Sequence, residues 1–328
     1  MKFRVFLGLI ISAVLLILAA RHVNPQEIIS LIKDVNLFYL AACVAFSISA
    51  VWFRALRWRY LLPDRRGVRT FNLFAATMIG YMGNNLLPFR VGDLARAYIA
   101  AKREQASTSA FLATVVVEHL LDLLTVLLIL GILVFFVSFP AWFTKGAYLL
   151  LGASLLVLAL LLLLKAKKEH VGSFIQRKFS FSGTQRIVDL SEAFFDGLKG
   201  LEVGRELVVV LFLSIPLWVA YALATYTALM ASHLDLPLAA SWALLSFIGI
   251  GLSLPSAPGF IGTFQFFTVA ALALFAVDES EAFGFSLVFH VSQFVPLTLF
   301  GWLLLLREQM ALSDLATLKR PGGKESPL

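Results

Sequence analysis

The sequence predicts an all-α polytopic membrane protein with about six full transmembrane helices and two re-entrant broken-helix units, arranged as an inverted repeat. Three observations lead to this fold class. The 328 residues are 60% hydrophobic and only 14% charged, whereas soluble domains are about 25% charged. Several apolar runs approach the ~20 residues that span a bilayer. Lys and Arg residues gather in the segments that this topology places in the cytoplasm, as the positive-inside rule requires.

Six apolar runs are each long enough to form one transmembrane helix. In chain order they are Phe3–Ala20, Leu37–Leu56, Phe111–Val137, Phe143–Leu164, Leu207–Ala231 and Phe283–Leu306. The third run is the longest, which predicts a tilted helix. We treat residues 1–318 as a single membrane domain and expect the polar tail at 319–328 to be disordered.

Two further apolar regions are interrupted by proline, which removes a backbone donor and disfavours helix at the preceding residue. They are Thr70–Leu87, which breaks at Pro88 and resumes through Arg103, and Ala239–Leu254, which breaks at 255–259 and resumes as Phe260–Val277. We interpret each as a helix–break–helix unit that enters the membrane and returns to the side from which it came.

The distribution of basic residues supports this topology. With the N-terminus in the cytoplasm, the cytoplasmic segments hold 24 of the 27 Lys and Arg residues. These segments are 1–4, 54–69, 90–103, 165–205 and 307–328. If either broken unit spanned the membrane, every later loop would change sides and the bias would be lost. We therefore expect a multi-pass protein of the cell inner (cytoplasmic) membrane with both termini in the cytoplasm.

The order of two helices, one broken unit and one helix occurs twice, in residues 1–139 and 140–310. Each half crosses the membrane three times, so the second half is inverted relative to the first. The second half also contains the polar segment 165–205, whose apolar residues recur at helical spacing and predict an amphipathic helix on the inner surface. Paired interrupted helices in inverted repeats mark the substrate site of many secondary transporters. We expect the two breaks to meet.

The first break is rich in polar and charged residues. They are Asn84, Asn85, Arg90, Asp93 and Arg96. The planar forks of the two arginines suit phosphate, and the aspartate can pair with either arginine. Two interpretations stay open. The charges form a structural pair at a cytoplasmic mouth, or Arg90 contacts a lipid head group while the asparagines bind ligand or satisfy the broken backbone.

Glu118 and Asp122 are four residues apart, so they share one face of the third apolar helix. Ionisable side chains inside such a helix are costly and usually functional. They either form structural pairs with Arg90 or Arg96, or act as proton carriers and counter-charges that release an arginine from its ligand. His119 lies on another face, where we expect a packed or interfacial histidine.

The second break supplies the remaining candidate residues. They are Pro258, Gly259, Gly262, Gln265 and, from the last apolar helix, His290. A glycine-rich break at the start of a half-helix can expose backbone amides to an anion. The alternative is a tight re-entrant turn. We expect His290 to line the same cavity.

A basic run from Arg54 to Arg59 lies at the inner end of the second predicted helix. We interpret it as an orientation signal with Trp58 as an interface anchor, or as a phosphate-binding patch for lipid head groups.

The sequence contains no HExxH zinc pair, no GxSxG elbow and no P-loop. The single Cys43 excludes a Cys-based metal site and a disulfide framework. We therefore expect no enzymatic activity, no metal and no cofactor. The net charge of +7 is expected to attract anionic lipid rather than nucleic acid.

Several motifs, taken in this order, resemble the flippase-like membrane domain of lysylphosphatidylglycerol synthases, which also occurs as a stand-alone family. They are Arg57-Trp58, the stretch Asn84…Pro88-Phe89-Arg90-Val91-Gly92-Asp93…Arg96, Glu118…Asp122, and Pro255…Pro258-Gly259-Phe260-Ile261-Gly262. The resemblance covers residues from about 3 to 310 and implies a lipid translocase. Because the aminoacyl-transfer domain of the full-length synthases is absent here, we expect no tRNA-dependent lipid modification.

Two positions depart from the family's pattern. Gln265 stands where the family often has Glu, and His119 stands where it often has Arg. Both changes remove a charge near the expected path, so the resemblance does not imply a cationic head group.

We expect a translocase that moves a polar-headed or phosphate-bearing lipid, either a membrane phospholipid or a polyprenyl-phosphate lipid, through a cavity between the two re-entrant units. The sequence does not determine the oligomeric state, and a homo-oligomer is one alternative. The alternatives are an intramembrane transferase on a lipid-linked substrate and an accessory subunit of a lipid or envelope-polymer pathway.

Overall fold

The computed structural model describes residues 2–62, 64, 67–87, 90–166, 184–197 and 204–308, which form helices and short connections without a strand. The helices are α1 Lys2–Ala20, α2 Pro25–Lys33, α3 Leu37–Leu61, α4 Thr70–Leu86, α5 Val91–Arg103, α6 Thr108–Leu133, α7 Ala141–Ala166, α9 Thr184–Gly197, α10 Arg205–Ala231, α11 Leu238–Leu252, α12 Thr263–Leu272 and α13 Glu279–Arg307, with the short 3₁₀ helices η2 Pro258–Phe260 and η3 Ala273–Phe275. The all-α fold class of a polytopic membrane protein is therefore confirmed.

Six segments of the described chain are long and apolar enough to cross a membrane. Five of them lie in α3, α6, α7, α10 and α13 and correspond to five of the six predicted helices. The sixth is Pro258–Phe275, the second arm of the second broken unit, and the return of this unit to its own side stays a prediction. The first predicted helix is present as α1, which forms with α2 a pair bent by 90°.

Helix α2 has no counterpart among the predicted helices, although its start carries a recognisable signature. The Asn24 side chain accepts a hydrogen bond from the backbone N–H of Gln26, and Pro25 occupies the first helical position. Both features are typical of helix N-termini. The predicted amphipathic helix is represented by α9, while the rest of the segment 165–205 is only partly described. The predicted tail at 319–328 lies outside the described residues.

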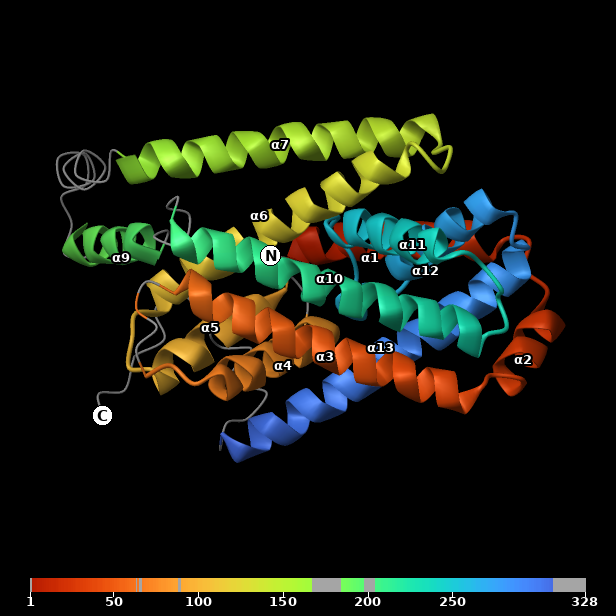
Figure 1. The fold of residues 1–328 in the computed structure, drawn as a ribbon, viewed down its shortest axis with the longest axis horizontal. Coiled ribbons are helices and arrows are strands. Elements are labelled where there is room, and N and C mark those ends of the chain that lie inside the picture. Colours follow the sequence, from red (N-terminus) through yellow and green to blue (C-terminus); the bar gives the residue numbers. More distant parts are fainter. Residues whose placement is uncertain are drawn as a thin grey trace.

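Both predicted interruptions are present. Helix α4 ends before Leu87 and α5 begins at Val91, and residues 253–262 separate α11 from α12. Figure 1 places the pair α4 and α5 toward one end of the bundle and the pair α11 and α12 toward the other. Helix α4 contacts η2, so the two breaks meet within the bundle.

Three glycines let α5 fold back tightly on α4. A Cβ atom on Gly92 would overlap the carbonyl oxygen of Gly80, and one on Gly83 would lie 2.8 Å from the Cα atom of Gly92. The two helices therefore pack backbone against backbone. Helix α5 also contacts α6, and these two contacts set the position of the charged residues on α5.

Buried apolar side chains form two cores. One core surrounds α4 and α5, and the other surrounds α11 and α12. Helices α3, α6, α10 and α13 contribute residues to both cores, so four long helices connect two centres that are each built on one broken unit. The repeat boundary between residues 139 and 140 stays a prediction.

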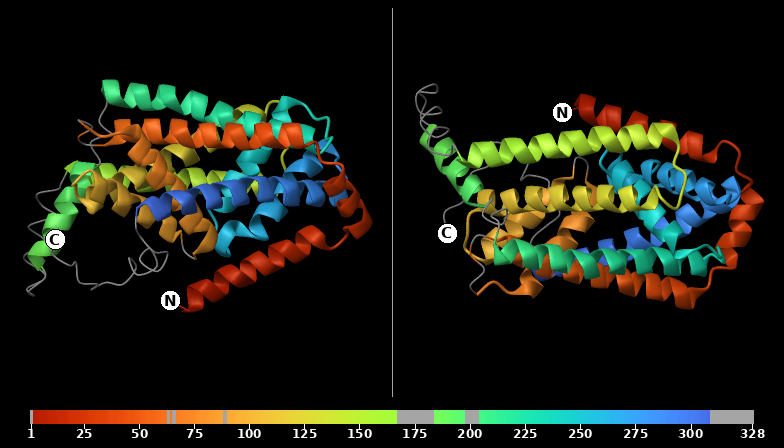
Figure 2. Two further views of the ribbon diagram at one scale, coloured as in Figure 1. Left: turned by 90° about the horizontal axis from the view of Figure 1, so that it is seen from below. Right: turned by 45° about the horizontal axis from the view of Figure 1, so that its top comes forward.

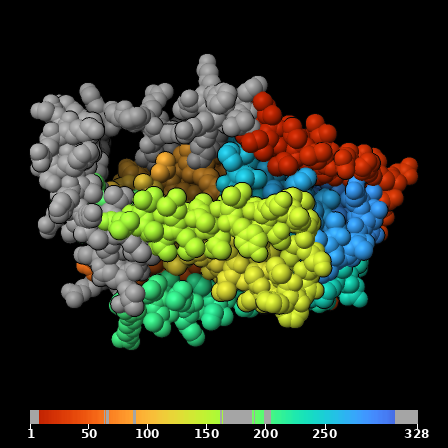
Figure 3. Space-filling view, turned by 90° about the horizontal axis from the view of Figure 1, so that it is seen from above, coloured from red at the N-terminus to blue at the C-terminus, as the bar shows by residue number. Residues whose placement is uncertain are grey.

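Helices α1 and α7 lie at the periphery of the bundle. Figure 2 shows α1 along its outside, where it contacts α12 and α13. Figure 3 shows α7 stretched across one face, beside α6. Tyr148 and Leu149 of α7 are 73% and 76% exposed, which is the expected state for apolar side chains that face lipid.

Candidate functional site

Three arginines and two carboxylates are buried together where α3, α5 and α6 meet. We call these five residues the buried charge cluster. They are Arg54, Arg57, Arg96, Glu118 and Asp122. Arg54 Nη1 lies 2.6 Å from Glu118 Oε1 and 2.5 Å from Asp122 Oδ2. Arg57 Nη2 lies 2.7 Å from Asp122 Oδ1, and its Nη1 donates to the Ser214 hydroxyl on α10 at 3.2 Å.

Arg96 joins the cluster from α5. Its Nη1 donates to Glu118 Oε1 at 3.0 Å, and its guanidinium carbon lies 5.1 Å from the centre of the Trp58 ring. The indole N–H of Trp58 donates to the Thr114 hydroxyl at 2.7 Å, which fixes the ring. Trp58 is thus a buried support for the arginine rather than the interface anchor that we expected.

The cluster keeps buried polar atoms without a hydrogen-bond partner among the described residues. They are Nε of Arg54, Nε of Arg57, Nε and Nη2 of Arg96, and Oε2 of Glu118. Arg57 and Glu118 are fully buried, and Arg96 is 2% exposed. A buried polar group without a partner is unfavourable by about 1–3 kcal/mol, and more when it is charged. Unpaired guanidinium nitrogens are therefore an arrangement that an oxyanion can satisfy.

A tyrosine pair closes one side of the cluster. The Tyr81 hydroxyl on α4 lies 3.1 Å from the Tyr221 hydroxyl on α10. The guanidinium carbon of Arg54 lies 5.9 Å from the centre of the Tyr221 ring. The pair joins the first broken unit to α10, next to the buried arginine.

Asp93 and His119 form the edge of the cluster. His119 Nε2 lies 3.1 Å from Asp93 Oδ2, and the Asn84 amide donates to Asp93 Oδ1 at 3.3 Å. Arg96 Nε lies 3.7 Å from the same Oδ1 atom. The His119 side chain is 39% exposed. This histidine, which we expected to pack elsewhere, therefore faces the aspartate because α5 folds back against α6.

Arg90 points away from the buried charge cluster and toward the second break. Its Nη2 donates to the carbonyl oxygen of Leu252, the last residue of α11, and its guanidinium carbon lies 5.8 Å from the centre of the Phe260 ring. Arg90 adopts the left-handed conformation, with φ 51°. The Asn85 amide donates to the Thr298 hydroxyl on α13 at 2.8 Å. Both residues thus connect the first break to the second half.

The second break is held by a chain of hydrogen bonds. His290 Nε2 lies 2.9 Å from the carbonyl oxygen of Gly259, and His290 Nδ1 lies 2.9 Å from the Gln265 amide nitrogen. Gln265 Oε1 in turn accepts from the backbone N–H of Gly262 at 2.7 Å. Pro258 begins η2 directly before Gly259. In these contacts the predicted residues of the second break bind one another, and the Gly262 amide is occupied.

The N-terminal helix also supports this break. The Ser12 hydroxyl accepts a hydrogen bond from the backbone N–H of Ala257 at 2.8 Å. Gly262 has φ 87°, and a Cβ atom there would overlap the Ser12 carbonyl oxygen. Helix α1 therefore packs directly against the unwound backbone of the second broken unit.

We expected Arg54 and Arg57 in the cytoplasmic segment 54–69, at the inner end of the second predicted helix, whereas α3 continues to Leu61 and buries both side chains. Their spacing contains a signal that identifies them. They are three residues apart on one helical face, and Glu118 and Asp122 are four apart on another. Two such faces in apolar helices satisfy each other's charge when the helices pack.

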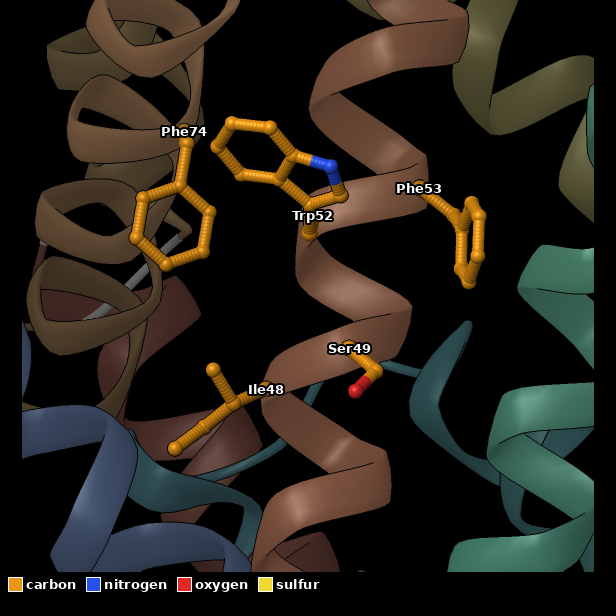
Figure 4. Close-up of a pocket in the computed structure, with 5 residues that line it drawn as sticks. All are labelled: Ile48, Ser49, Trp52, Phe53 and Phe74. Carbon is orange, nitrogen blue, oxygen red and sulfur yellow. The ribbon is translucent and has the colours of Figure 1, made fainter.

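An apolar pocket of about 320 Å³ lies on the outer side of α3, apart from the charged residues. Figure 4 shows Trp52 and Phe74 beside each other on one side of α3 and Phe53 on the other. Ile48 and Ser49 complete its lining. The Trp52 and Phe74 rings meet edge to face at 5.6 Å. None of its lining residues belongs to the buried charge cluster.

Residues 5–301 match the family described as the lysylphosphatidylglycerol synthase TM region. The chain belongs to this family. The UPF0104 membrane protein MJ1078 of Methanocaldococcus jannaschii is 24% identical over 66% of the chain and 90% of its own length. The Glycosyltransferase AglD of Haloferax volcanii is 24% identical over 86% of the chain. The chain spans about half of AglD, 51% of its length. No solved structure matches the chain significantly.

The relationship to AglD corrects one prediction. The expectation that the chain has no enzymatic activity is wrong as stated, because a relative that matches most of the chain is named as an enzyme. The expectation rested on missing signatures of zinc proteases, serine hydrolases and P-loop nucleotide hydrolases. None of those signatures bears on glycosyl transfer.

Proposed function

We propose that the protein moves a lipid with a phosphate-bearing head group between the leaflets of the membrane. The observation that carries the proposal is the set of unpaired guanidinium nitrogens in the buried charge cluster. Arginine binds phosphate through two parallel hydrogen bonds in a planar fork. The head group would pass the cluster while the acyl chains stay in the bilayer.

The two broken units give the head group a path. Backbone without helical hydrogen bonds is tolerated at membrane depth only inside protein or along a water-filled cavity. The breaks meet at Arg90, Leu252 and Phe260, and separation of these contacts would open a route between the two halves. We propose that both units are re-entrant and related as an inverted repeat, which is the arrangement in many secondary transporters.

The proposal keeps the N-terminus and the C-terminus in the cytoplasm of a cell with an inner membrane. The distribution of basic residues supports this orientation even without the buried arginines. Of all 27 Lys and Arg residues, 24 lie in the segments predicted to be cytoplasmic. Without the buried Arg54, Arg57 and Arg96, the count is 21 of 24. The bias therefore does not depend on side chains that the fold hides.

Leaflet exchange in liposomes tests the proposal. Purified full-length protein is reconstituted, and labelled phosphatidylglycerol, an aminoacylated phosphatidylglycerol and a polyprenyl phosphate are offered separately. Arg96→Gln is expected to slow exchange about tenfold or more, since a charged hydrogen bond contributes about 1.5–3 kcal/mol. The control is Arg205→Ala, an exposed arginine at the start of α10. Exchange that is equally fast with Arg96→Gln, or absent with every lipid, contradicts the proposal.

A second candidate function follows from the name of AglD. The chain would take part in glycosyl transfer to or from a lipid-linked phosphate, with the arginines of the buried charge cluster holding the phosphate. Purified protein is incubated with a polyprenyl phosphate and a mixture of nucleotide sugars, and the lipid fraction is analysed by mass spectrometry. A glycosylated lipid that depends on Arg96 supports this function, and an unchanged lipid contradicts it.

A further inference from the structure

The buried charge cluster and its edge are balanced in formal charge. Arg54, Arg57 and Arg96 carry three positive charges, Asp93, Glu118 and Asp122 carry three negative charges, and His119 at the edge is counted as neutral. A phosphodiester head group brings one further negative charge into this environment. An uncompensated charge in a buried site is unfavourable by several kcal/mol, so a second event has to restore the balance.

Protonation of one carboxylate restores the balance, and the hydrogen bonds indicate which carboxylate it is. Both oxygens of Asp122 are paired, one with Arg54 and one with Arg57. Asp93 Oδ1 accepts a hydrogen bond from the Asn84 amide, and its Oδ2 lies 3.1 Å from His119 Nε2. Among these three carboxylates of the described chain, Glu118 alone has an oxygen, Oε2, that is buried without a partner.

The surroundings of Glu118 leave few other groups that can take the proton. The charged groups against Glu118 are Arg54 and Arg57 on α3, Arg96 on α5 and Asp122 on its own helix. Tyr81 and Tyr221 lie beside Arg54, and Asp93 and His119 lie beyond Arg96 at the edge. The arginines are already protonated, and neutral tyrosines take up no proton near neutral pH. The remaining carboxylates would have to give up a paired oxygen, and His119 lies beside Asp93 at the exposed edge rather than against Glu118.

We infer that binding of the lipid phosphate is coupled to the uptake of one proton at Glu118. The proton comes from bulk water and binds the carboxylate at Oε2. The neutral carboxylic acid then donates that proton in a hydrogen bond to a phosphate oxygen, while Arg54 and Arg96, which Glu118 Oε1 now occupies, turn to the phosphate. Release of the head group returns the proton to water. This inference rests on the proposed function.

Calorimetry of lipid binding tests the coupling. The full chain in nanodiscs of phosphatidylcholine is titrated with short-chain phosphatidylglycerol in two buffers of different ionisation enthalpy, near neutral pH. The phosphodiester itself does not titrate there. Wild type is expected to take up about one proton per bound lipid. Glu118→Gln is expected to bind the lipid without proton uptake, because its side chain is already neutral, and Asp278→Asn, at an exposed cap, is expected to behave like wild type.

Difference infrared spectroscopy of the wild type gives a readout that does not depend on a variant. The carbonyl band of a protonated carboxylic acid is expected to appear when lipid binds. Binding without proton uptake and without this band overturns the coupling and leaves the proposed function standing. Uptake that persists in Glu118→Gln overturns the assignment to Glu118. A wild type that binds none of the offered lipid overturns the coupling together with the proposed function.

Discussion

Arg54 and Asp122 form an ion pair of 2.5 Å across the interface of α3 and α6. The same Nη1 atom of Arg54 lies 2.6 Å from Glu118, one turn earlier on α6. One guanidinium therefore joins two carboxylates on successive turns, and Arg57 binds the second of them from one turn further along α3. The register of α3 against α6 is thus fixed by charge as well as by packing.

Removal of one partner from this arrangement is expected to be severe. Arg57→Met is expected to lower the free energy of unfolding by about 1–3 kcal/mol, because Asp122 Oδ1 loses its partner while Oδ2 keeps Arg54. The double variant Arg57→Met with Asp122→Leu is expected to lose less than the two single variants together. Thermal unfolding of the purified protein in detergent measures both effects. A double variant whose loss equals the sum would show that the two side chains do not interact.

The close approach of α4 and α5 predicts a strong effect of a single methyl group. Gly92→Ala is expected to push α5 away from α4, because its Cβ would meet the backbone of α4. Overpacking of this kind typically lowers stability by about 1–3 kcal/mol, and Arg96 would shift with α5. The matched control is Gly152→Ala on α7, where a Cβ meets nothing within 4 Å. Equal unfolding temperatures for the two variants would argue against backbone packing at Gly92.

Arg90 and Arg96 are expected to differ in their effect on lipid binding. Arg96→Gln removes a nitrogen pair from the buried charge cluster and is expected to weaken binding of short-chain phosphatidylglycerol about tenfold or more. Arg90→Ala is expected to leave the affinity within about threefold, because Arg90 binds Leu252 rather than the cluster. Calorimetry in nanodiscs compares the two. A larger loss for Arg90→Ala would move the head-group site to the breaks.

The cap of α13 predicts a pH dependence outside the membrane-spanning segments. The backbone N–H of Ser280 binds the Asp278 carboxylate and lowers the pKa of that group. A lowered pKa in the folded state contributes stability that is present above the unfolded pKa and is lost as pH falls through the folded pKa. The stability of wild type relative to Asp278→Asn is therefore expected to decline as pH falls below about 4. A constant difference in unfolding temperature across that range contradicts this assignment.

Much of the fold follows from features that a single sequence displays. The interruptions near Pro88 and at 255–259 appear where proline and glycine disfavour helix, and five of the six predicted helices are among the segments that can cross a membrane. The end of α3 was harder to place, because Arg54 and Arg57 resemble a loop orientation signal. Both arginines can be buried only because Glu118 and Asp122, more than 60 residues away in sequence, neutralise their charge.

The site was predictable in part. Glu118, Asp122 and Arg96 were candidates because a charge within an apolar helix is costly, and the structure brings these three together. The position of Arg90 depends on its left-handed backbone and on Leu252 of the other half. No local pattern encodes a contact of that kind. His119 likewise meets Asp93 only because the glycines of α4 and α5 let the two helices close.

The packing of α1 on the second break has a consequence for biosynthesis. Ser12 is synthesised before its partner Ala257, which follows 245 residues later in the chain. Contacts so distant in sequence form late, because a long loop has to close first. Helix α1 therefore lacks one of its final neighbours until α12 has been synthesised. Until then, the face of α1 that packs against the unwound backbone near Gly262 has no cover from the second broken unit.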